Sequence, residues 1–357
     1  WSTGFLFAAM AGATPLLAQE QHADLLIHRK DGEVTLVPDD NLYIHQEYAA
    51  PPKPDRKAIV SFSYENDLVA GNDFGYTSGG RLSYLSSEDV PEWFSDAAAK
   101  FPLFDEDGNQ RLSFALGQSI FTPEDITVQN PDPNDRPYAG ILYGSAGIIS
   151  DTGDRLDNFN LTVGLVGPGS FAEQTQEFVH DLVDTRDPAG WRNQLKTEVG
   201  VNLAYDRQWR NLYEFSEGGL GVDFTPSVGV SLGTIYTYAS AGGMVRFGQA
   251  LPRDYGPPRI RPSLPGTDFF VPQDDFGWYL FFGSEGRVIG RNLFLDGNTF
   301  RDSPSVDKRY LVADLIGGIA FTIEDVRLAY THVYRTEEYK TQNENAQFGA
   351  FNVSFRF

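Results

Sequence analysis

Apolar and polar residues alternate with a period of two along most of the chain after Ala58. In 351–357 every second residue is Phe or Val, and the residues between them are Asn, Ser and Arg. The same alternation recurs in 112–116, 159–165 and 326–330. A strand with one apolar and one polar face is typical of a membrane β-barrel with a wet interior. A soluble β-sandwich alternates similarly but buries its apolar face between two sheets.

The alternation predicts an all-β fold, a transmembrane antiparallel β-barrel of about twelve strands over 58–357. An even number of strands places both ends of the barrel on the periplasmic side, and closure satisfies every backbone group in lipid. The connections 91–110 and 252–275 then fall on the periplasmic side, where turns are usually short, and they are the least certain part of this topology. The predicted strands begin near Ala58, Tyr76, Arg111, Tyr138, Asn158, Trp191, Val222, Thr237, Phe276, Tyr310, Val326 and Gln347.

The first residues indicate export. Residues 1–18 carry no charge and are rich in apolar and small residues, as in a signal peptide that lacks its basic beginning. Residues 19–57 are polar and predict a periplasmic leader or linker, with a short hairpin around Val34–Val37. The last strand ends in Phe357, which is typical of strands that the barrel-assembly machinery recognises. We therefore expect a bacterial outer-membrane protein, and a monomer.

Composition narrows the possible functions. The formal net charge is −21, and a phosphate backbone needs a basic face, so nucleic-acid binding is excluded. The acidity provides a solvated surface and also suits divalent cations, which prefer oxygen ligands. The chain has no cysteine, which excludes disulfides and thiolate metal sites. No stretch after the signal reaches about 18 apolar residues, so strands must cross the membrane.

One segment departs from the period of two. Between residues 168 and 187, Phe171, Thr175, Phe178 and Leu182 recur at helical spacing. This spacing predicts a short helix in an extracellular loop, with Ser170 as its cap and His180 in its third turn. Gln176 lies one turn before His180, on the same face.

The even strand count brings several polar clusters to one end of the barrel, the extracellular rim. They lie where the first strand ends, where the second and fourth begin, and in the helix after the fifth. The residues concerned are Asn66, Asp67, Thr77, Arg136, Gln176 and His180.

The order and spacing of these clusters resemble the lipid A 3′-O-deacylases of the LpxR family, from about Val60 to Phe357. The matching pieces are Glu65-Asn66-Asp67, Tyr76-Thr77-Ser78-Gly79, Phe121-Thr122-Pro123, Asp135-Arg136-Pro137-Tyr138-Ala139-Gly140 and Gln176-x-x-x-His180. The resemblance implies a twelve-stranded barrel and a Ca²⁺-dependent esterase. Such an enzyme removes the 3′-linked acyloxyacyl chain from lipid A of lipopolysaccharide in the outer leaflet.

The resemblance also implies roles for individual residues. His180 is the general base for water, Gln176 orients the ring or the water, and Asn66 donates to the oxyanion. Asp67 binds calcium, and Thr77 supports the calcium shell or the substrate. We add one interpretation, that Arg136 binds a glucosamine phosphate, because guanidinium suits phosphate.

The chain departs from the family pattern at one point. The characterised deacylase has a functional lysine shortly after the Thr/Ser-Pro turn, whereas here Glu124-Asp125-Ile126-Thr127-Val128 follows Pro123. This leaves the detail of substrate binding open.

Plainer interpretations of the same residues stay open. Asn66 and Asp67 are also common turn formers, and Arg136 could pair with an acid or line the lumen. Tyr138 and Trp191 suit packing or an aromatic girdle better than a site. One alternative function is an outer-membrane phospholipase with a Ser-His pair, but no serine follows His180 closely. Another is a non-catalytic pore or structural barrel.

Overall fold

The chain divides into two compact units, Trp1–Pro51 and Pro52–Phe357. The computed structural model describes residues 25–30, 33–38, 55–67, 75–91, 96, 98, 100, 103–104, 108–184, 186–210, 213–217, 219–260, 262 and 266–357. In the first unit, β1 (Leu25–Lys30) and β2 (Glu33–Pro38) form an antiparallel hairpin, as predicted for this region. The predicted signal peptide lies outside the described residues. Among the described residues, no helix is long and apolar enough to cross a membrane.

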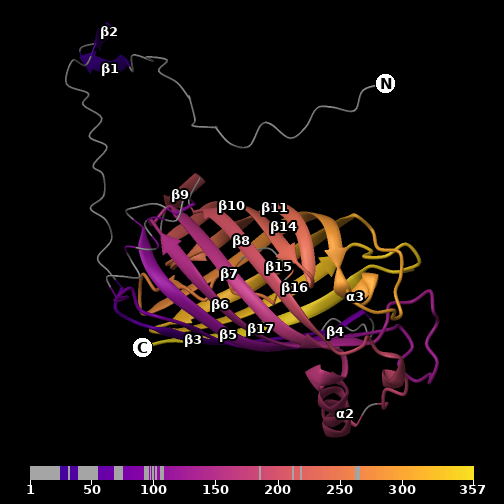
Figure 1. The fold of residues 1–357 in the computed structure, drawn as a ribbon. Coiled ribbons are helices and arrows are strands. Elements are labelled where there is room, and N and C mark those ends of the chain that lie inside the picture. Colours follow the sequence, from indigo (N-terminus) through magenta and orange to yellow (C-terminus); the bar gives the residue numbers. More distant parts are fainter. Residues whose placement is uncertain are drawn as a thin grey trace. The chain divides into compact units, whose positions relative to one another are not determined.

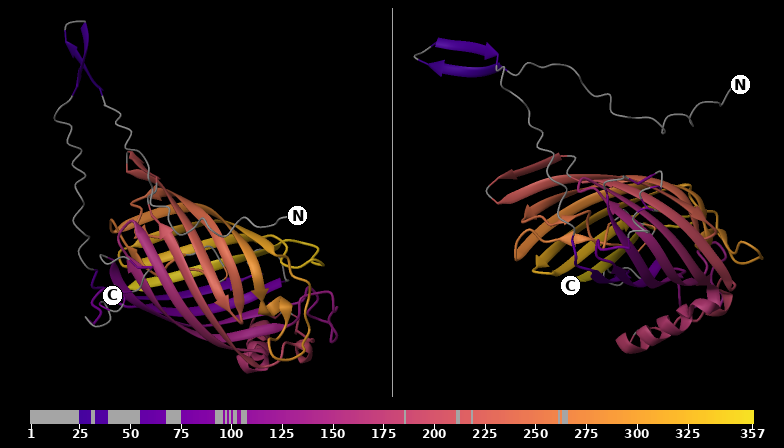
Figure 2. Two further views of the ribbon diagram at one scale, coloured as in Figure 1. Left: turned by 45° about the horizontal axis from the view of Figure 1, so that its top comes forward. Right: turned by 60° about the vertical axis from the view of Figure 1, so that its left-hand side comes forward.

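The second unit is a closed antiparallel barrel (Figures 1 and 2). The barrel closes because β17 pairs with β3 and β10 pairs with β11. Both β8 and β9 pair with β10, at different stretches, so the described strands fill twelve positions around the wall, as the sequence predicts. The strands are β3 (Ile59–Asn66), β4 (Gly75–Leu85), β5 (Asn109–Thr122), β6 (Ala139–Asp151), β7 (Arg155–Val166), β8 (Glu198–Trp209), β9 (Tyr213–Glu217), β10 (Leu220–Gly233), β11 (Tyr236–Gln249), β14 (Phe276–Asn292), β15 (Leu311–Ile323), β16 (Val326–Arg335) and β17 (Ala346–Arg356).

The two ends of the barrel differ. The terminal rim holds Ile59 and Arg356, where the wall begins and ends in sequence. The opposite end, the α2 rim, carries the short helical segments. These are η2 (Gly167–Ser170), α2 (Ala172–Val183), η3 (Trp191–Asn193) and α3 (Leu293–Asp296). The predicted strand start near Trp191 is wrong, because Trp191 opens a 3₁₀ turn and β8 begins at Glu198.

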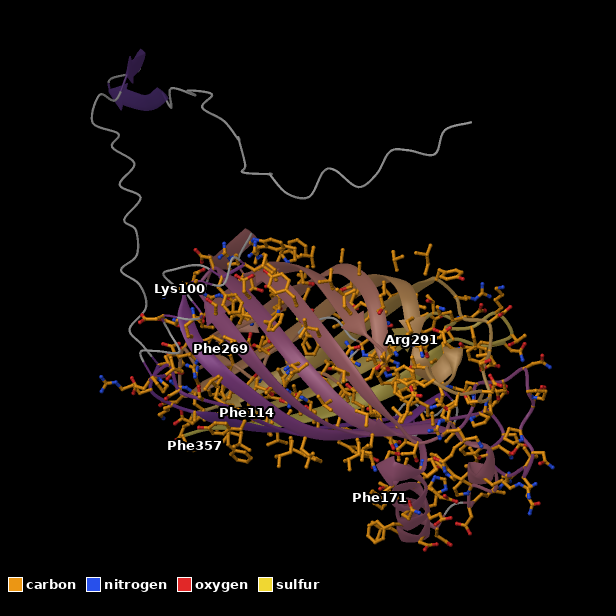
Figure 3. The ribbon with its side chains drawn as sticks, viewed as in Figure 1. Lys100, Phe114, Phe171, Phe269, Arg291 and Phe357 are labelled. Atoms are coloured by element: carbon orange, nitrogen blue, oxygen red, sulfur yellow. The ribbon has the colours of Figure 1, made fainter. Side chains whose placement is uncertain are left out.

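The wall alternates as the sequence predicts. In β3 the side chains of Ser61, Ser63 and Glu65 are buried, whereas Phe62 between them is half exposed on the outside. Figure 3 shows this outer apolar layer, with Phe114 labelled on it. We call these outward apolar side chains the lipid-facing belt. On β3 to β7 the belt includes Phe62, Leu82, Phe114, Leu116, Leu161, Val163 and Leu165.

The long connection between β11 and β14 leaves from the terminal rim and folds into the lumen, where we call it the plug. The plug contains the short pair β12 (Arg253–Asp254) and β13 (Phe270–Val271). The segment 252–275 therefore leaves from the same rim as the two ends of the wall, as strand parity predicts, and its periplasmic side stays a prediction. The segment is long because it fills the barrel instead of only joining two strands.

Charged pairs attach the plug to the wall. Asp254 accepts hydrogen bonds from Arg327 at 2.9 Å and from the Tyr279 hydroxyl at 3.0 Å, and it is also paired with Arg246. Further along the plug, the Arg259 Nε donates to Glu65 Oε1 at 3.0 Å. All six side chains are buried, so each charge has an opposite charge or a hydroxyl group close by, as buried ions require.

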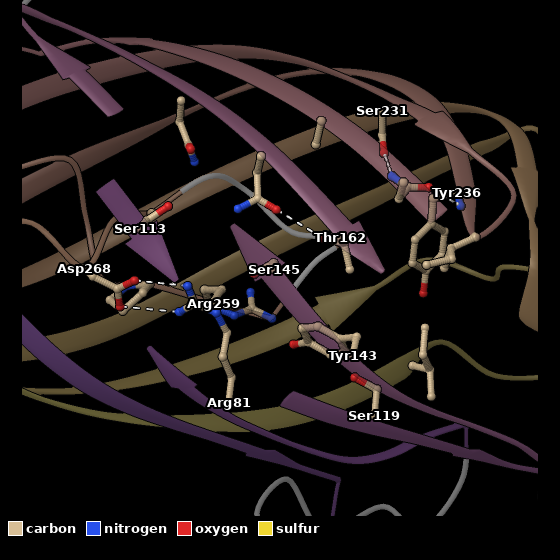
Figure 4. A pocket seen from close by; sticks show the side chains of 18 of the residues that line it. Arg81, Ser113, Ser119, Tyr143, Ser145, Thr162, Ser231, Tyr236, Arg259 and Asp268 are labelled. Atoms are coloured by element: carbon tan, nitrogen blue, oxygen red, sulfur yellow. Dashed lines mark hydrogen bonds and ion pairs between the residues drawn. The ribbon is translucent and has the colours of Figure 1, made fainter. Parts of the chain in front are cut away.

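A small polar cavity remains between the plug and the wall (Figure 4). Arg81 and Arg259 lie beside it, and Arg81 pairs with Asp268 of the plug at 3.0 Å. Its volume of about 110 Å³ is well below the roughly 300 Å³ at which small-molecule pockets begin. This cavity is therefore too small for a lipid headgroup.

Candidate active site

Helix α2 docks against the outside of the wall, where β6 begins. A side chain at Gly140 would place its Cβ 2.2 Å from the Ala172 Cβ and 2.5 Å from the Ser170 Oγ, so glycine is required for this close approach. Ala172 packs there with Ile120 and Trp191. The predicted cap, Ser170, is wrong. Its hydroxyl donates to the Gly167 carbonyl at 2.6 Å, and Phe171 occupies the N-cap.

The direction of α2 follows from its contacts. The turn η2 contacts β7 and β6, and α2 then contacts β6 and β5. Gln118, on the outer face of β5, donates to the Ser170 carbonyl at 2.7 Å and holds the start of the helix. The contacts of the helical segment therefore run from β7 to β5, while the helix itself projects from the end of the barrel (Figure 1).

His180 lies on the buried face of α2, as predicted, with 5 % of its surface exposed. Its Nδ1 lies 2.5 Å from the Arg186 carbonyl oxygen. A carbonyl only accepts, so Nδ1 carries the proton. The Nε2 of a neutral ring then has a free lone pair, which is the state that a general base needs.

Gln176 confirms this tautomer from the other side of the ring. The indole Nε1 of Trp191 can only donate, and it lies 2.8 Å from Gln176 Oε1. The amide NH₂ of Gln176 therefore points to His180, where Nε2 accepts at 3.4 Å. The chain Trp191–Gln176–His180 thus fixes which nitrogen of the histidine is the acceptor.

Trp191 is a positioning residue that the sequence interpretation missed. It was assigned to packing or a girdle, yet its indole orients Gln176. Tyr138 holds it in place at 4.9 Å between ring centroids, and the Tyr138 hydroxyl donates to the Ile126 carbonyl at 3.0 Å. The one available signal was that Trp191 lies in a stretch without alternation, between Gly190 and β8.

Asn66 ends β3 on the outer face of the wall, the same side as α2. Residue alternation places it with Phe62 and Tyr64, opposite to the lumenal Glu65. In the strand register, Asn66 pairs with Ser78, Ser78 with Ile120, and Ile120 with Gly140. This row across four strands ends at the glycine that α2 covers.

Asp67 follows Asn66 and is almost completely buried, with 1 % exposure. Its carboxylate, the Asn66 amide oxygen and nearby backbone carbonyls are hard oxygen donors, which calcium prefers. Among the described residues, no group of three or more His, Asp or Glu side chains is arranged to hold a metal ion. The donors fit calcium in kind, and carbonyls or water would have to complete its six to eight ligands.

Thr77 and Arg136 differ in their placement from the other predicted site residues. Thr77 lies at an irregularity of β4, between Tyr76 and Ser78, and its side chain lies outside the described part of the chain. Arg136 is buried, stacks over the Phe121 ring at 5.0 Å and pairs with Glu338 at 3.4 Å. These contacts hold Arg136 inside the barrel end, away from the outer face with His180. Its binding of phosphate stays a prediction.

Comparison with known proteins identifies relatives of this fold. The chain matches the family described as "Outer membrane protein LpxR" over residues 6–357. No curated protein matches the chain in sequence.

Solved structures agree with the family match. LpxR from Salmonella typhimurium is similar, with a TM-score of 0.69 and 18% identity over 84% of this chain and 100% of that one. The beta domain of the Bordetella autotransporter BrkA has a TM-score of 0.43 and 8% identity, over 85% of this chain and 100% of that one. The translocator domain of NalP from Neisseria meningitidis has a TM-score of 0.37 and 11% identity, over 84% of this chain and 88% of that one. The first of these likenesses shows the fold, and the other two are too distant to support an argument.

Proposed function

The chain belongs to the LpxR family of outer-membrane proteins, and on this premise we propose that it is a lipid A deacylase. The finer proposal is a Ca²⁺-dependent esterase that removes the 3′-linked acyloxyacyl chain. One observation carries it. His180 is held as a neutral base, by contacts to both ring nitrogens, on a helix that docks at the outside of a membrane barrel.

The proposed chemistry starts at Nε2 of His180. This nitrogen takes a proton from water while the water oxygen attacks the ester carbonyl. The proton then passes to the alcohol oxygen of the glucosamine as the carbon–oxygen bond breaks, and a free fatty acid leaves. The Nδ1–H of the imidazolium stays hydrogen-bonded to the Arg186 carbonyl throughout, which stabilises the positive charge.

The oxyanion would be stabilised from the end of β3. The Asn66 amide can donate to the oxygen that gains charge. Asp67 and neighbouring carbonyls would hold calcium, which supplies Lewis-acid stabilisation of the carbonyl when bound. The chemistry of Asp67 supports this role, because a carboxylate is a hard oxygen donor of the kind that calcium prefers.

The dimensions support a single site that combines His180 on α2 with Asn66 at the end of β3. Neighbouring strands lie about 4.8 Å apart, so Asn66 is roughly 14 Å from Gly140 along the row. From Ala172 to His180 the helix rises about 12 Å, at 1.5 Å per residue. The contacts of α2 run from β6 toward β5, and the length of the helix is comparable with the distance along the row.

A cation near the site would replace the lysine that the family pattern leads us to expect. Arg186 is exposed, and its carbonyl already holds His180. The pKa of Asp125 is below its usual value, chiefly through hydrogen bonds from Thr127 and to a smaller extent through the charge of Arg186. The segment that follows Arg186 lies beside the turn that replaces the lysine, because the Ala189 amide donates to the Ile126 carbonyl at 2.8 Å. We favour Arg186 over the buried Arg136 for binding a lipid A phosphate, and Thr77 remains a proposed substrate or calcium-shell residue.

The alternatives are less well supported. A phospholipase of the Ser-His kind needs a serine hydroxyl hydrogen-bonded to the base, whereas the hydrogen-bond partners that the described residues give His180 are Gln176 and the Arg186 carbonyl. A pore needs an open lumen, and the plug fills this one.

Mass spectrometry of lipid A tests the proposal. The purified barrel is incubated with lipopolysaccharide in detergent, with Ca²⁺ or with EDTA. We expect loss of one acyloxyacyl mass with Ca²⁺ only, and a rate about 10²- to 10⁴-fold lower for His180→Ala, which is the usual contribution of general-base catalysis. The matched control is His332→Ala, which removes a histidine from the outer face of β16. Equal rates for the two variants would contradict the role of His180, and no loss from the folded wild type would contradict deacylation.

A further inference from the structure

Helix α2 has more surface than the proposed chemistry uses. Ala172, Gln176 and His180 are buried and recur every four residues. At 100° per residue, these three positions lie within about 80° of one another. Most of the remaining circumference of the helix is exposed.

The exposed part divides into two faces by chemistry. Phe178 and Leu182 are 68% and 74% exposed, lie one turn apart, and share a side with Phe171, which precedes the helix. We call these three residues the apolar face of α2. On the opposite flank of the buried positions lie Glu173, Glu177 and Asp181, which form the acidic face. Burial and the charge of Glu177 raise the pKa of Glu173, as expected for acids in one row.

We propose that the apolar face of α2 binds the acyl chains of the membrane leaflet around the α2 rim, while the acidic face stays in water. A helix with one apolar and one charged side lies at a membrane interface. Three exposed large apolar side chains together on a soluble surface would otherwise favour association.

The apolar face continues a surface that already faces lipid. Leu165 belongs to the lipid-facing belt on β7, and Gly169 of η2 packs beside it, with 3.8 Å between the Leu165 Cβ and a Cβ built at Gly169. Phe171 follows two residues later. Figure 3 labels Phe171 beside α2. The apolar face of α2 therefore begins next to the lipid-facing belt on β7.

This arrangement gives α2 two roles. Its buried face holds His180, and its apolar face fixes the height of the helix in the leaflet. An ester in the acyl region would then meet His180 at the depth where it already lies. The inference goes beyond the proposed function, since a catalytically silent barrel with this helix would bind lipid in the same way.

Single spin labels test the proposal directly, because the chain has no cysteine. Phe178→Cys and Leu182→Cys label the apolar face, and Glu177→Cys and Asp181→Cys label adjacent positions of the acidic face. Phe114→Cys provides the lipid reference. Each labelled barrel is reconstituted into dioleoylphosphatidylcholine vesicles, and collision with oxygen and with a water-soluble nickel complex on both sides of the membrane is measured.

We expect the labels at 178 and 182 to match the label at 114, with a high ratio of oxygen to nickel collisions. The labels at 177 and 181 should show the reverse. Equal nickel collisions at all four helix positions would overturn the proposal. So would shielding of 178 and 182 from both reagents, which would indicate a protein partner. No outcome depends on hydrolysis of lipid A, so failure here is distinct from failure of the proposed function.

Discussion

Single hydrogen bonds decide which nitrogen of His180 is available. The Arg186 carbonyl requires a proton on Nδ1, and the Gln176 amide, oriented by Trp191, requires a lone pair on Nε2. The orientations of side-chain amides and imidazole rings follow from their hydrogen-bond networks. One of these contacts alone would therefore not determine the tautomer of His180. Together they determine one tautomer.

The Trp191→Phe variant tests this chain of hydrogen bonds. Phenylalanine keeps most of the packing against Tyr138 but has no N–H for Gln176. Loss of one buried hydrogen bond of about 1.4 kcal/mol predicts a roughly tenfold lower kcat with little change in KM. The control is Trp278→Phe on β14, near the terminal rim. Equal kcat values for Trp191→Phe and wild type would show that the indole does not position the site.

Some contacts of individual residues could not be predicted from the sequence. Histidine, glutamine and their spacing were visible, because four residues span one helical turn. Trp191 joins them across fifteen positions and an irregular loop, where no periodicity applies. The side of the wall on which Arg136 lies was equally hidden. Its partner, Glu338, is 202 residues away.

At the scale of elements, the docking of α2 requires a position in the wall that has no side chain. Outward-facing side chains cover most of β6, but Gly140 leaves room for Ala172 and Ser170. The helix therefore docks where the strand row that contains Asn66 ends. Strand parity predicted the shared rim correctly, but only the register showed that Asn66 and α2 lie on the same outer face.

A Gly140→Ala variant should displace α2 without disturbing the barrel. The new Cβ would lie 2.2 Å from that of Ala172, so the helix must move by about an ångström. A shift of this size at a catalytic group costs about 100-fold in kcat/KM. Gly144→Ala is the matched control, because a Cβ there meets only the Ala115 carbonyl, at 4.0 Å. Heat-modifiable migration in SDS gels reports folding of both variants, and similar activity of the two would refute the docking argument.

At the scale of the whole molecule, the plug fills the lumen, so the barrel is not an open channel. Period-two alternation predicted the twelve strand positions, since each strand carries its own pattern. The plug could not be predicted in this way. Its proline-rich sequence shows no period, and its attachment depends on pairs such as Arg259 with Glu65, 194 residues apart.

The buried pair of Arg259 and Glu65 should contribute strongly to stability. Removal of one partner from a buried ion pair costs about 3–5 kcal/mol, so Arg259→Met should lower the free energy of unfolding by this amount. The double variant Arg259→Met, Glu65→Met leaves no uncompensated charge and should recover most of the loss. Urea unfolding in lipid vesicles measures both. If the double variant is no more stable than the single one, the pair does not explain how the plug is held.

The central claim is that His180 on α2 and the end of β3 form one site on the outer face of the wall. A structure of His180→Ala with Ca²⁺ and lipid A in nanodiscs tests it most directly. We predict the 3′-ester between residue 180 and Asn66, with calcium on Asp67 and the plug still in the lumen. Lipid A ordered inside the barrel, or calcium bound away from Asp67 with the ester distant from residue 180, would contradict the account.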